Sequence, residues 1–339
     1  MSEYRGIQGA AVQALTSNTG TLEGQIWYDS ANGQFKLESI SVTGAFASGG
    51  TIGAARSGGP MFAVGTQSAT VISNGANPGS PPPDYTQRTD EYDGTSWAVG
   101  NNSTQPAANS LSSAGVLTAA LMAGGYRGPI GRTNYVETYD GTSFAAGTAM
   151  STTREGAFGG GISTAMFVSS GGPISGGAPT TTEEWDGVSW SPKGAIGAHA
   201  QSGGSSGTVA AGLAFGGNTN YPTTISVNKT YEYSSPTWTT GGDLNTPRAV
   251  GAPSMGGSQT ATLYMGGNNR PGGIVTNNEE YDGTSWANTT VLPAARENGG
   301  GTGTSTLGLV SGGSIPGQTD TTLEWTGAGV AVTRTITTT

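Results

Sequence analysis

The chain has 339 residues, of which 60 are glycine and none is cysteine, and only 10% are charged. Its 22 acidic and 13 basic residues give a net charge of −9 with no basic run, so the attraction that drives nucleic-acid binding is missing. Without cysteine, disulfides and thiolate metal sites are excluded. No apolar stretch reaches the roughly 18 residues of a membrane span, so neither nucleic acid nor membrane insertion is expected.

The N-terminal 45 residues contain one hairpin signal and lack the charged-then-apolar layout of a signal peptide. Residues 24–37 read GQIWYDSANGQFKL, and Asn32-Gly33 between aromatic-bearing segments is typical of a β-hairpin. The stretch GQIWYDSANGQFKLES resembles short hairpins near the N-termini of tailed-bacteriophage virion proteins. This resemblance implies that residues 1–45 anchor the chain to a particle.

From residue 46 onwards one fragment recurs six times: an aromatic residue, a tight turn and a second aromatic. The first aromatics lie 44 to 48 residues apart, and such a period with strand-like units is typical of a β-propeller. The last copy, EWTGAGV, has lost its second aromatic at Val330. The aromatic positions that carry the repeat are Tyr92, Trp97, Tyr139, Phe144, Trp185, Trp190, Tyr233, Trp238, Tyr281, Trp286 and Trp325.

Two further markers keep the same period. A Gly-Gly pair closes an apolar run at Gly124, Gly171, Gly216, Gly266 and Gly312, with Ser73-Asn74-Gly75 in the first unit. An upstream polar position falls at Arg56, Asn109, Arg154, Gln201, Arg248 and Arg296. The three markers predict an all-β fold, with residues 46–339 forming a six-bladed propeller and residues 1–45 a separate segment. A seventh blade that includes the N-terminal hairpin stays an alternative.

Each unit reads as a four-stranded blade. In the last one, the Gly-rich segment around residues 296–304 predicts a first strand near the axis, and LGLVSGG predicts a buried second strand. The second aromatic is expected to pack beside the Gly-Gly pair of its own or the next blade. Asp-Gly pairs predict two-residue type I′ turns, so their aspartates are interpreted as turn formers rather than metal ligands. These pairs begin at Asp93, Asp140, Asp186 and Asp282.

The markers together resemble the kelch repeat, which combines a Gly-Gly after the second strand with a spaced Tyr and Trp. The resemblance covers about residues 46–336 and implies that strand acids pair with Arg154, Arg248 and Arg296. It departs from that repeat in its Gly/Thr-rich composition, at Ser234-Ser235 and at Val330. A closed ring needs a strand that joins its ends. Either Phe35–Val42 or the C-terminal GVAVTRTITTT could supply it, and the sequence leaves both open.

No catalytic set, metal site or cofactor is predicted. His199 is the single histidine and lies beside no repeated carboxylate, so it is interpreted as a surface residue. Adjacent acids leave glycoside hydrolysis open as an alternative, because that reaction needs only two carboxyl groups at the right separation. Their recurrence at equivalent positions favours a structural part instead. These acids are Asp90-Glu91, Glu183-Glu184 and Glu279-Glu280.

The loops after the second strand of each unit vary in length and sequence. Loops on a rigid scaffold commonly bind partners, and aromatic and arginine side chains are the usual anchors. The candidate binding residues on these loops are Tyr85, Tyr126, Arg127, Tyr221 and Arg270.

The sequence therefore predicts a non-enzymatic virion structural protein of a tailed phage, assembled in the host cytoplasm and exposed on the particle. Residues 1–45 are expected to contact other virion proteins, and the propeller to attach to a host-surface glycan or receptor or to decorate the capsid or tail. A carbohydrate-active enzyme with an acidic pair and a kelch-type binding adaptor are the alternatives. The position on the particle and the oligomeric state stay open.

Overall fold

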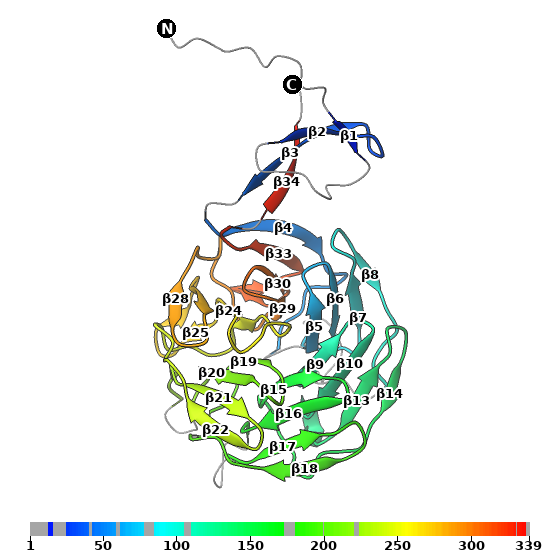
Figure 1. Cartoon of the computed structure of the whole chain (residues 1–339). Coiled ribbons are helices and arrows are strands. Elements are labelled where there is room, and N and C mark those ends of the chain that lie inside the picture. The colour runs from blue at the N-terminus through cyan, green and yellow to red at the C-terminus, as the bar shows by residue number, and fades with distance from the viewer. Residues whose placement is uncertain are drawn as a thin grey trace. The chain divides into compact units, whose positions relative to one another are not determined.

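Six four-stranded sheets stand in a ring in the computed structural model of the chain, which is a six-bladed β-propeller as the sequence period predicts (Figure 1). The structure describes residues 13–15, 25–40, 43–58, 62–77, 85–104, 110–172, 180–198, 200–219, 224–329 and 331–336. The propeller, Phe46–Trp325, is one of two compact units. The other joins Met1–Ala45 to Thr326–Thr339, so the last strand belongs to the N-terminal unit and not, as predicted, to the propeller.

The blades follow each other along the chain, each with its first strand innermost. Blade 1 contains β5 (Phe62–Thr66), β6 (Ala69–Ser73), β7 (Thr89–Tyr92) and β8 (Trp97–Val99). Blade 2 contains β9 (Ser112–Val116), β10 (Ala119–Ala123), β13 (Val136–Tyr139) and β14 (Phe144–Ala146). Blade 3 contains β15 (Phe158–Ile162), β16 (Ala165–Ser169), β17 (Thr182–Trp185) and β18 (Trp190–Lys193).

The second half of the ring repeats this arrangement, apart from the last strand. Blade 4 contains β19 (Gly204–Gly207), β20 (Gly212–Phe215), β21 (Thr230–Ser234) and β22 (Thr237–Thr240). Blade 5 contains β23 (Ala252–Pro253), β24 (Thr262–Met265), β27 (Asn278–Tyr281) and β28 (Trp286–Asn288). Blade 6 contains β29 (Gly300–Gly303), β30 (Leu307–Ser311), β33 (Thr321–Thr326) and, from the other end of the chain, β4 (Ala45–Thr51).

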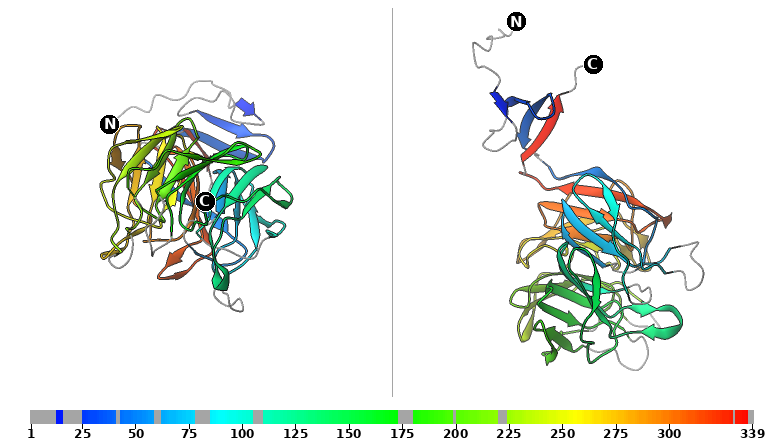
Figure 2. Two further views of the ribbon diagram at one scale, coloured as in Figure 1. Left: turned by 90° about the horizontal axis from the view of Figure 1, so that it is seen from below. Right: turned by 90° about the vertical axis from the view of Figure 1, so that its right-hand side faces the viewer.

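Strand β4 closes the ring. It is the outermost strand of blade 6 and lies beside β33, as the right-hand view of Figure 2 shows. Neither segment named from the sequence does this. Strand β3 (Gln34–Ile40), which covers most of Phe35–Val42, pairs instead with the C-terminal β34 (Ala331–Ile336), from Phe35 opposite Ile336 to Ile40 opposite Ala331. Both candidate segments therefore belong to the smaller unit.

The smaller unit is a four-stranded sheet in the order β1 (Gln13–Leu15), β2 (Ile26–Asp29), β3 and β34. Strands β2 and β3 form the hairpin that the Asn32-Gly33 signal predicts. The Asp29 carboxylate accepts hydrogen bonds from the backbone N–H of Ala31 and Asn32, at 3.0 and 3.2 Å, which holds the turn. Because this sheet is separate, the hairpin is not part of a seventh blade.

Small residues near the axis explain the glycine-rich composition. The first strands contact one another around the ring, and there serine and threonine hydroxyls bond to the neighbouring backbone. Ser205 Oγ both accepts from Gly159 N–H, at 3.0 Å, and donates to Gly159 O, at 2.9 Å. Second strands supply the larger apolar groups; Leu213 and Phe215 of β20, for example, pack against aromatic residues of blade 5. Large side chains therefore fill the space between blades and small ones the crowded centre.

The connections between second and third strands carry short extra hairpins. These are β11 (Tyr126–Arg127) with β12 (Gly131–Arg132), β25 (Asn268–Asn269) with β26 (Gly273–Ile274), and β31 (Ser314–Ile315) with β32 (Gly317–Gln318). A single 3₁₀ turn, η1 (Gly128–Ile130), is the helical structure of the described residues, and no helix among them is long and apolar enough to cross a membrane.

Each Gly-Gly position ties its blade to the next one. Gly266 and Gly267 have φ angles of +62° and +113°, and Gly267 N–H donates to the Arg296 carbonyl, at 2.8 Å. A Cβ on Gly267 would lie 2.7 Å from the Ala249 carbonyl oxygen. In blades 1 and 3 the corresponding left-handed pairs are Asn74-Gly75 and Ser170-Gly171. The second position of the repeat therefore needs glycine for both its dihedral angles and its close approach.

Candidate functional site

Buried arginines pair with the first acid of each predicted acid pair, Asp90, Glu183 and Glu279. Arg56 lies 2.7 Å from Asp90, Arg154 lies 3.2 Å from Glu183, and Arg248 pairs with Glu279. All six side chains are at most 3% exposed. Burial lowers the pKa of Arg56 to about 10, although Asp90 opposes that shift. Each guanidinium also donates to backbone carbonyls, so these pairs hold the third strand against the second.

Three blades depart from this arrangement. In blade 4 both charges are replaced, by Gln201 and Tyr231. In blade 6 Arg296 keeps its place opposite Leu323, and its guanidinium donates to the carbonyl of Gly312 and to Thr321. The predicted pairing of Arg154 and Arg248 is thus confirmed, whereas that of Arg296 is wrong. In blade 2 Asn109 stands at the arginine position and lies outside the described residues.

A second set of polar contacts joins neighbouring blades. In four blades, a tyrosine near the end of the third strand donates its hydroxyl to a glutamate on the third strand of the preceding blade. Tyr92 donates to Glu324 at 2.6 Å, Tyr233 to Glu184 at 2.7 Å, and Tyr281 to Glu232 at 2.6 Å. Tyr139 makes the same contact with Glu91. Burial and these carboxylates raise the pKa of each tyrosine hydroxyl well above its usual value.

The second aromatic of the repeat reaches the same neighbour. Trp97, Trp238 and Trp286 donate their Nε1–H to Thr322, Thr182 and Thr230 of the preceding blade, at 2.8–2.9 Å. Each also packs against the tyrosine of its own blade, with ring centroids 4.6–5.1 Å apart. The expected packing beside the Gly-Gly pairs is therefore wrong. The tryptophans bridge two blades because each carries both a large ring and one donor.

The interface between blades 2 and 3 lacks the tyrosine–glutamate contact. Trp185 replaces the tyrosine and donates its Nε1–H to Ser163 O, at 3.1 Å, within its own blade. Thr138 stands where the other blades carry glutamate. A cavity of about 370 Å³ opens at this place, lined by Thr138, Trp185 and residues of both blades. It lies on the face formed by the turns between first and second strands and between third and fourth strands.

Blade 5 shows the opposite mismatch. In blade 6, Trp325 replaces the tyrosine and donates its Nε1–H within its own blade. Glu280 of blade 5 still occupies the glutamate position, but no tyrosine hydroxyl is there to donate a hydrogen bond to it. Burial raises the pKa of this carboxyl because water is withdrawn from its charged form. The fold therefore tolerates a glutamate opposite a tryptophan.

The Asp-Gly turns are longer than predicted. Tyr92 pairs with Trp97, so four residues and not two connect β7 to β8. Gly94 has φ +91°, and the Asp93 carboxylate accepts the backbone N–H of Thr95 and Ser96, at 2.8 and 2.7 Å. The same contacts recur at Asp140, Asp186 and Asp282. These aspartates are turn formers, and the hydrogen bonds lower the pKa of each one.

Four of the five predicted binding residues lie on the opposite face. Tyr85 and Tyr126 are half-buried, and Arg270 is exposed on the connection between β25 and β26. Arg127 is only 4% exposed and stacks over the Tyr135 ring, with its guanidinium carbon 4.8 Å from the ring centroid. It is therefore placed as a packing residue within blade 2. Tyr221 and His199 lie outside the described residues.

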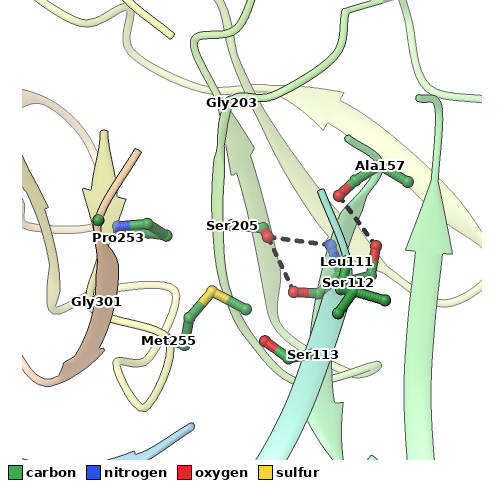
Figure 3. Close-up of a pocket in the computed structure, with 11 residues that line it drawn as sticks. Leu111, Ser112, Ser113, Ala157, Gly203, Ser205, Pro253, Met255 and Gly301 are labelled. Carbon is green, nitrogen blue, oxygen red and sulfur yellow. Dashed lines mark hydrogen bonds between the residues drawn. The ribbon is translucent and has the colours of Figure 1, made fainter. Parts of the chain in front are cut away.

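The centre of the ring is narrow. Met255 lies among the first strands, beside Pro253, Ser112 and Ser205, as Figure 3 shows. The cavity there has a volume of only about 10 Å³, roughly the room of one water molecule. Its lining residues carry no carboxylate. Among the described residues no group of three or more His, Cys, Asp or Glu side chains is placed to hold a metal ion.

No protein-family model matches the chain, and no curated protein matches it in sequence. The β-propeller fold thus stands on the structure alone. Reasoning from the sequence missed the cavity between blades 2 and 3. The sequence does contain a signal for it, because Thr138 departs from the repeated glutamate and Trp185 departs from the repeated tyrosine. Only the structure of the ring shows that these two positions face each other.

Proposed function

We propose that this protein is a non-enzymatic structural component of a tailed-phage particle. In this proposal the smaller unit attaches the chain to other virion proteins, and the propeller is displayed on the particle surface. The propeller then binds a host-surface glycan or receptor, or decorates the capsid or tail. The protein is assembled with the particle in the host cytoplasm.

The β2–β3 hairpin is the observation that carries this proposal. Its sequence resembles N-terminal hairpins of phage virion proteins, and one of its faces is apolar. Ile26 pairs with Leu37 and Tyr28 with Phe35, whose rings lie 5.2 Å apart. Ile26 and Phe35 are each 46% exposed. Exposed apolar residues that gather on one face are typical of a protein contact, which supports attachment through this unit.

The placement of the acids favours a role without catalysis. A glycoside hydrolase needs two carboxyl groups that flank one substrate bond. Asp90, Glu183 and Glu279 are instead buried against arginines, and Glu91 and Glu184 accept tyrosine hydroxyls. These contacts support a structural role for the recurrent carboxylates.

The blades are also proposed to be kelch-like. The left-handed Gly-Gly positions after the second strands support this, and so do the arginine–acid pairs of blades 1, 3 and 5. The kelch-type adaptor is the neighbouring hypothesis, which differs in needing no particle.

Antibody–gold labelling of purified phage particles from the source tests the proposal, with serum raised against residues 46–339. Label at fibre tips is expected for receptor binding, and label spread over the capsid for decoration. A matched pair of variants tests the anchor: Phe35→Glu should remove the label, and Val188→Glu, at an exposed propeller turn, should keep it. Absence of label from every particle would overturn the virion proposal and favour the adaptor.

A further inference from the structure

We propose that the cavity between blades 2 and 3 binds one neutral six-membered sugar ring. The cavity lies where the repeat is broken on both sides at once. At four other interfaces a glutamate and a tyrosine hydroxyl meet across this space. Here Thr138 is shorter than glutamate, and Trp185 turns its donor to its own blade. The volume of about 370 Å³ is at the small end of ligand pockets.

The walls combine apolar surface with several hydroxyl groups. Trp185, Tyr139 and the methyl groups of Ala119, Ala120 and Ala145 form the apolar part of the lining. Thr118, Thr138, Ser143, Ser163 and Thr164 supply hydroxyls. A sugar ring has the complementary chemistry, because its C–H groups pack on apolar and aromatic surface while its hydroxyls both donate and accept hydrogen bonds.

Charge narrows the ligand to a neutral sugar. Asp140 lines the cavity, and its carboxylate is fixed by the backbone N–H of Thr142 and Ser143, at 2.8 and 2.7 Å. These bonds lower the pKa of Asp140, so it is ionised at neutral pH and accepts hydrogen bonds without donating any. No basic side chain lines the cavity, so an acidic sugar would bring a second negative charge next to Asp140 without a counter-ion.

Binding is tested on the isolated full chain by saturation-transfer NMR with the methyl glycosides of glucose, galactose, mannose and N-acetylglucosamine. At least one of these probes should receive saturation at its ring C–H protons. Thr138→Glu restores the glutamate of the other blades and fills the cavity, so it should weaken the binding of that probe at least tenfold. The variant should fold, because Glu280 already lies opposite a tryptophan at the equivalent interface.

Two further variants complete the test. Thr138→Val keeps the volume and removes one hydroxyl, so it should weaken binding by roughly three- to tenfold. Thr284→Glu puts the same charge on an exposed turn of blade 5 and should leave binding unchanged. The inference is overturned if no probe binds, or if Thr138→Glu binds as tightly as the unmodified chain.

The biological use of this cavity in attachment rests on the proposed virion role, but its measurement does not. If the sugar binds but no particle is labelled, the sugar-binding proposal stands and the virion proposal is overturned. If particles are labelled but no sugar binds, the virion proposal stands and the sugar-binding proposal is overturned.

Discussion

Buried charge is the residue-scale feature that most affects stability in this ring. Arg248 and Glu279 are both 0% exposed and paired, whereas Arg296, which is 3% exposed, has no carboxylate partner among the described residues. Burial lowers the pKa of Arg296 to about 10. The two arginines therefore form a natural comparison, since both donate to backbone carbonyls and only one neutralises an acid.

Arg248→Met should destabilise the propeller by roughly 3–5 kcal/mol, because it leaves the Glu279 carboxylate buried without a positive charge beside it. Arg296→Met should cost about 1 kcal/mol less, because no carboxylate is left behind. Urea unfolding at pH 7 measures both. Equal losses would show that the backbone hydrogen bonds, and not the ion pair, make the contribution.

Glu280 is a second buried residue that affects stability, because no tyrosine hydroxyl donates a hydrogen bond to its carboxyl group. Burial raises its pKa in the folded state, so the folded chain binds more protons than the unfolded chain between the two pKa values. Stability therefore falls as the pH rises through that interval, and the cost is complete above the folded pKa. Glu280→Gln removes this cost and should make the protein more stable at pH 7.

The gain should be almost gone near pH 4, where the carboxyl is mostly protonated in both states. Glu232→Gln is the matched control, since Glu232 occupies the same position in blade 4 and accepts the Tyr281 hydroxyl at 2.6 Å. That change should destabilise by about 1 kcal/mol through a weaker hydrogen bond. Urea unfolding at pH 7 and pH 4 separates them. A loss of stability in Glu280→Gln at pH 7 would contradict the burial explanation.

The sequence predicted contacts within a blade better than contacts between blades. The pairs of Arg154 and Arg248 follow from two markers that share one period. The tyrosine–glutamate contacts join Tyr281 to Glu232, 49 residues apart, and need the direction of each side chain around the ring. Alternation along a strand gives two faces, but it does not say which neighbour each face meets. The cavity at Thr138 was missed for the same reason.

At the scale of the element, side-chain hydrogen bonds determine the turn length better than the Asp-Gly dipeptide predicts it. Asp-Gly suggested a two-residue turn, yet the Asp140 side chain bonds two following N–H groups and holds a four-residue connection. The serine at the fourth position contributes, because Ser143 Oγ donates to the same carboxylate, at 3.2 Å. The motif to recognise was thus Asp-Gly-x-Ser, in which the aspartate replaces the partners that strand pairing would supply.

The Gly-Gly position after β24 gives a second prediction at the scale of the element. Gly267→Ala should destabilise by roughly 3 kcal/mol or more, because alanine meets both a left-handed φ of +113° and the Ala249 carbonyl oxygen, 2.7 Å from its Cβ. Gly131→Ala is the control, with φ +85° but no atom within 4 Å of the added Cβ, and should cost about 1–2 kcal/mol. Thermal unfolding compares the two. Similar losses would mean that the dihedral angle alone requires glycine.

At the scale of the whole molecule, ring closure is the part that the sequence did not reveal. The six-blade period was plain because each blade repeats its aromatics and glycines. The closing strand reads AFASGGT, which lacks the alternation that marks a strand and has one β-branched residue, Thr51. The more strand-like segments at residues 34–40 and 331–336 pair with each other instead. Propensity therefore pointed to the wrong segments because tertiary pairing decides which edge is filled.

Closure by β4 predicts how the chain can be shortened. A fragment of residues 45–326 keeps all six four-stranded sheets and should unfold at the temperature of the full propeller, as a monomer. A fragment of residues 53–326 lacks β4, so the edge of β33 is unpaired and Phe46 no longer packs on Trp325, where the rings lie 4.9 Å apart. It should unfold at a lower temperature and self-associate. Calorimetry and size-exclusion chromatography compare the fragments; equal stability and size would show that the ring holds without its N-terminal strand.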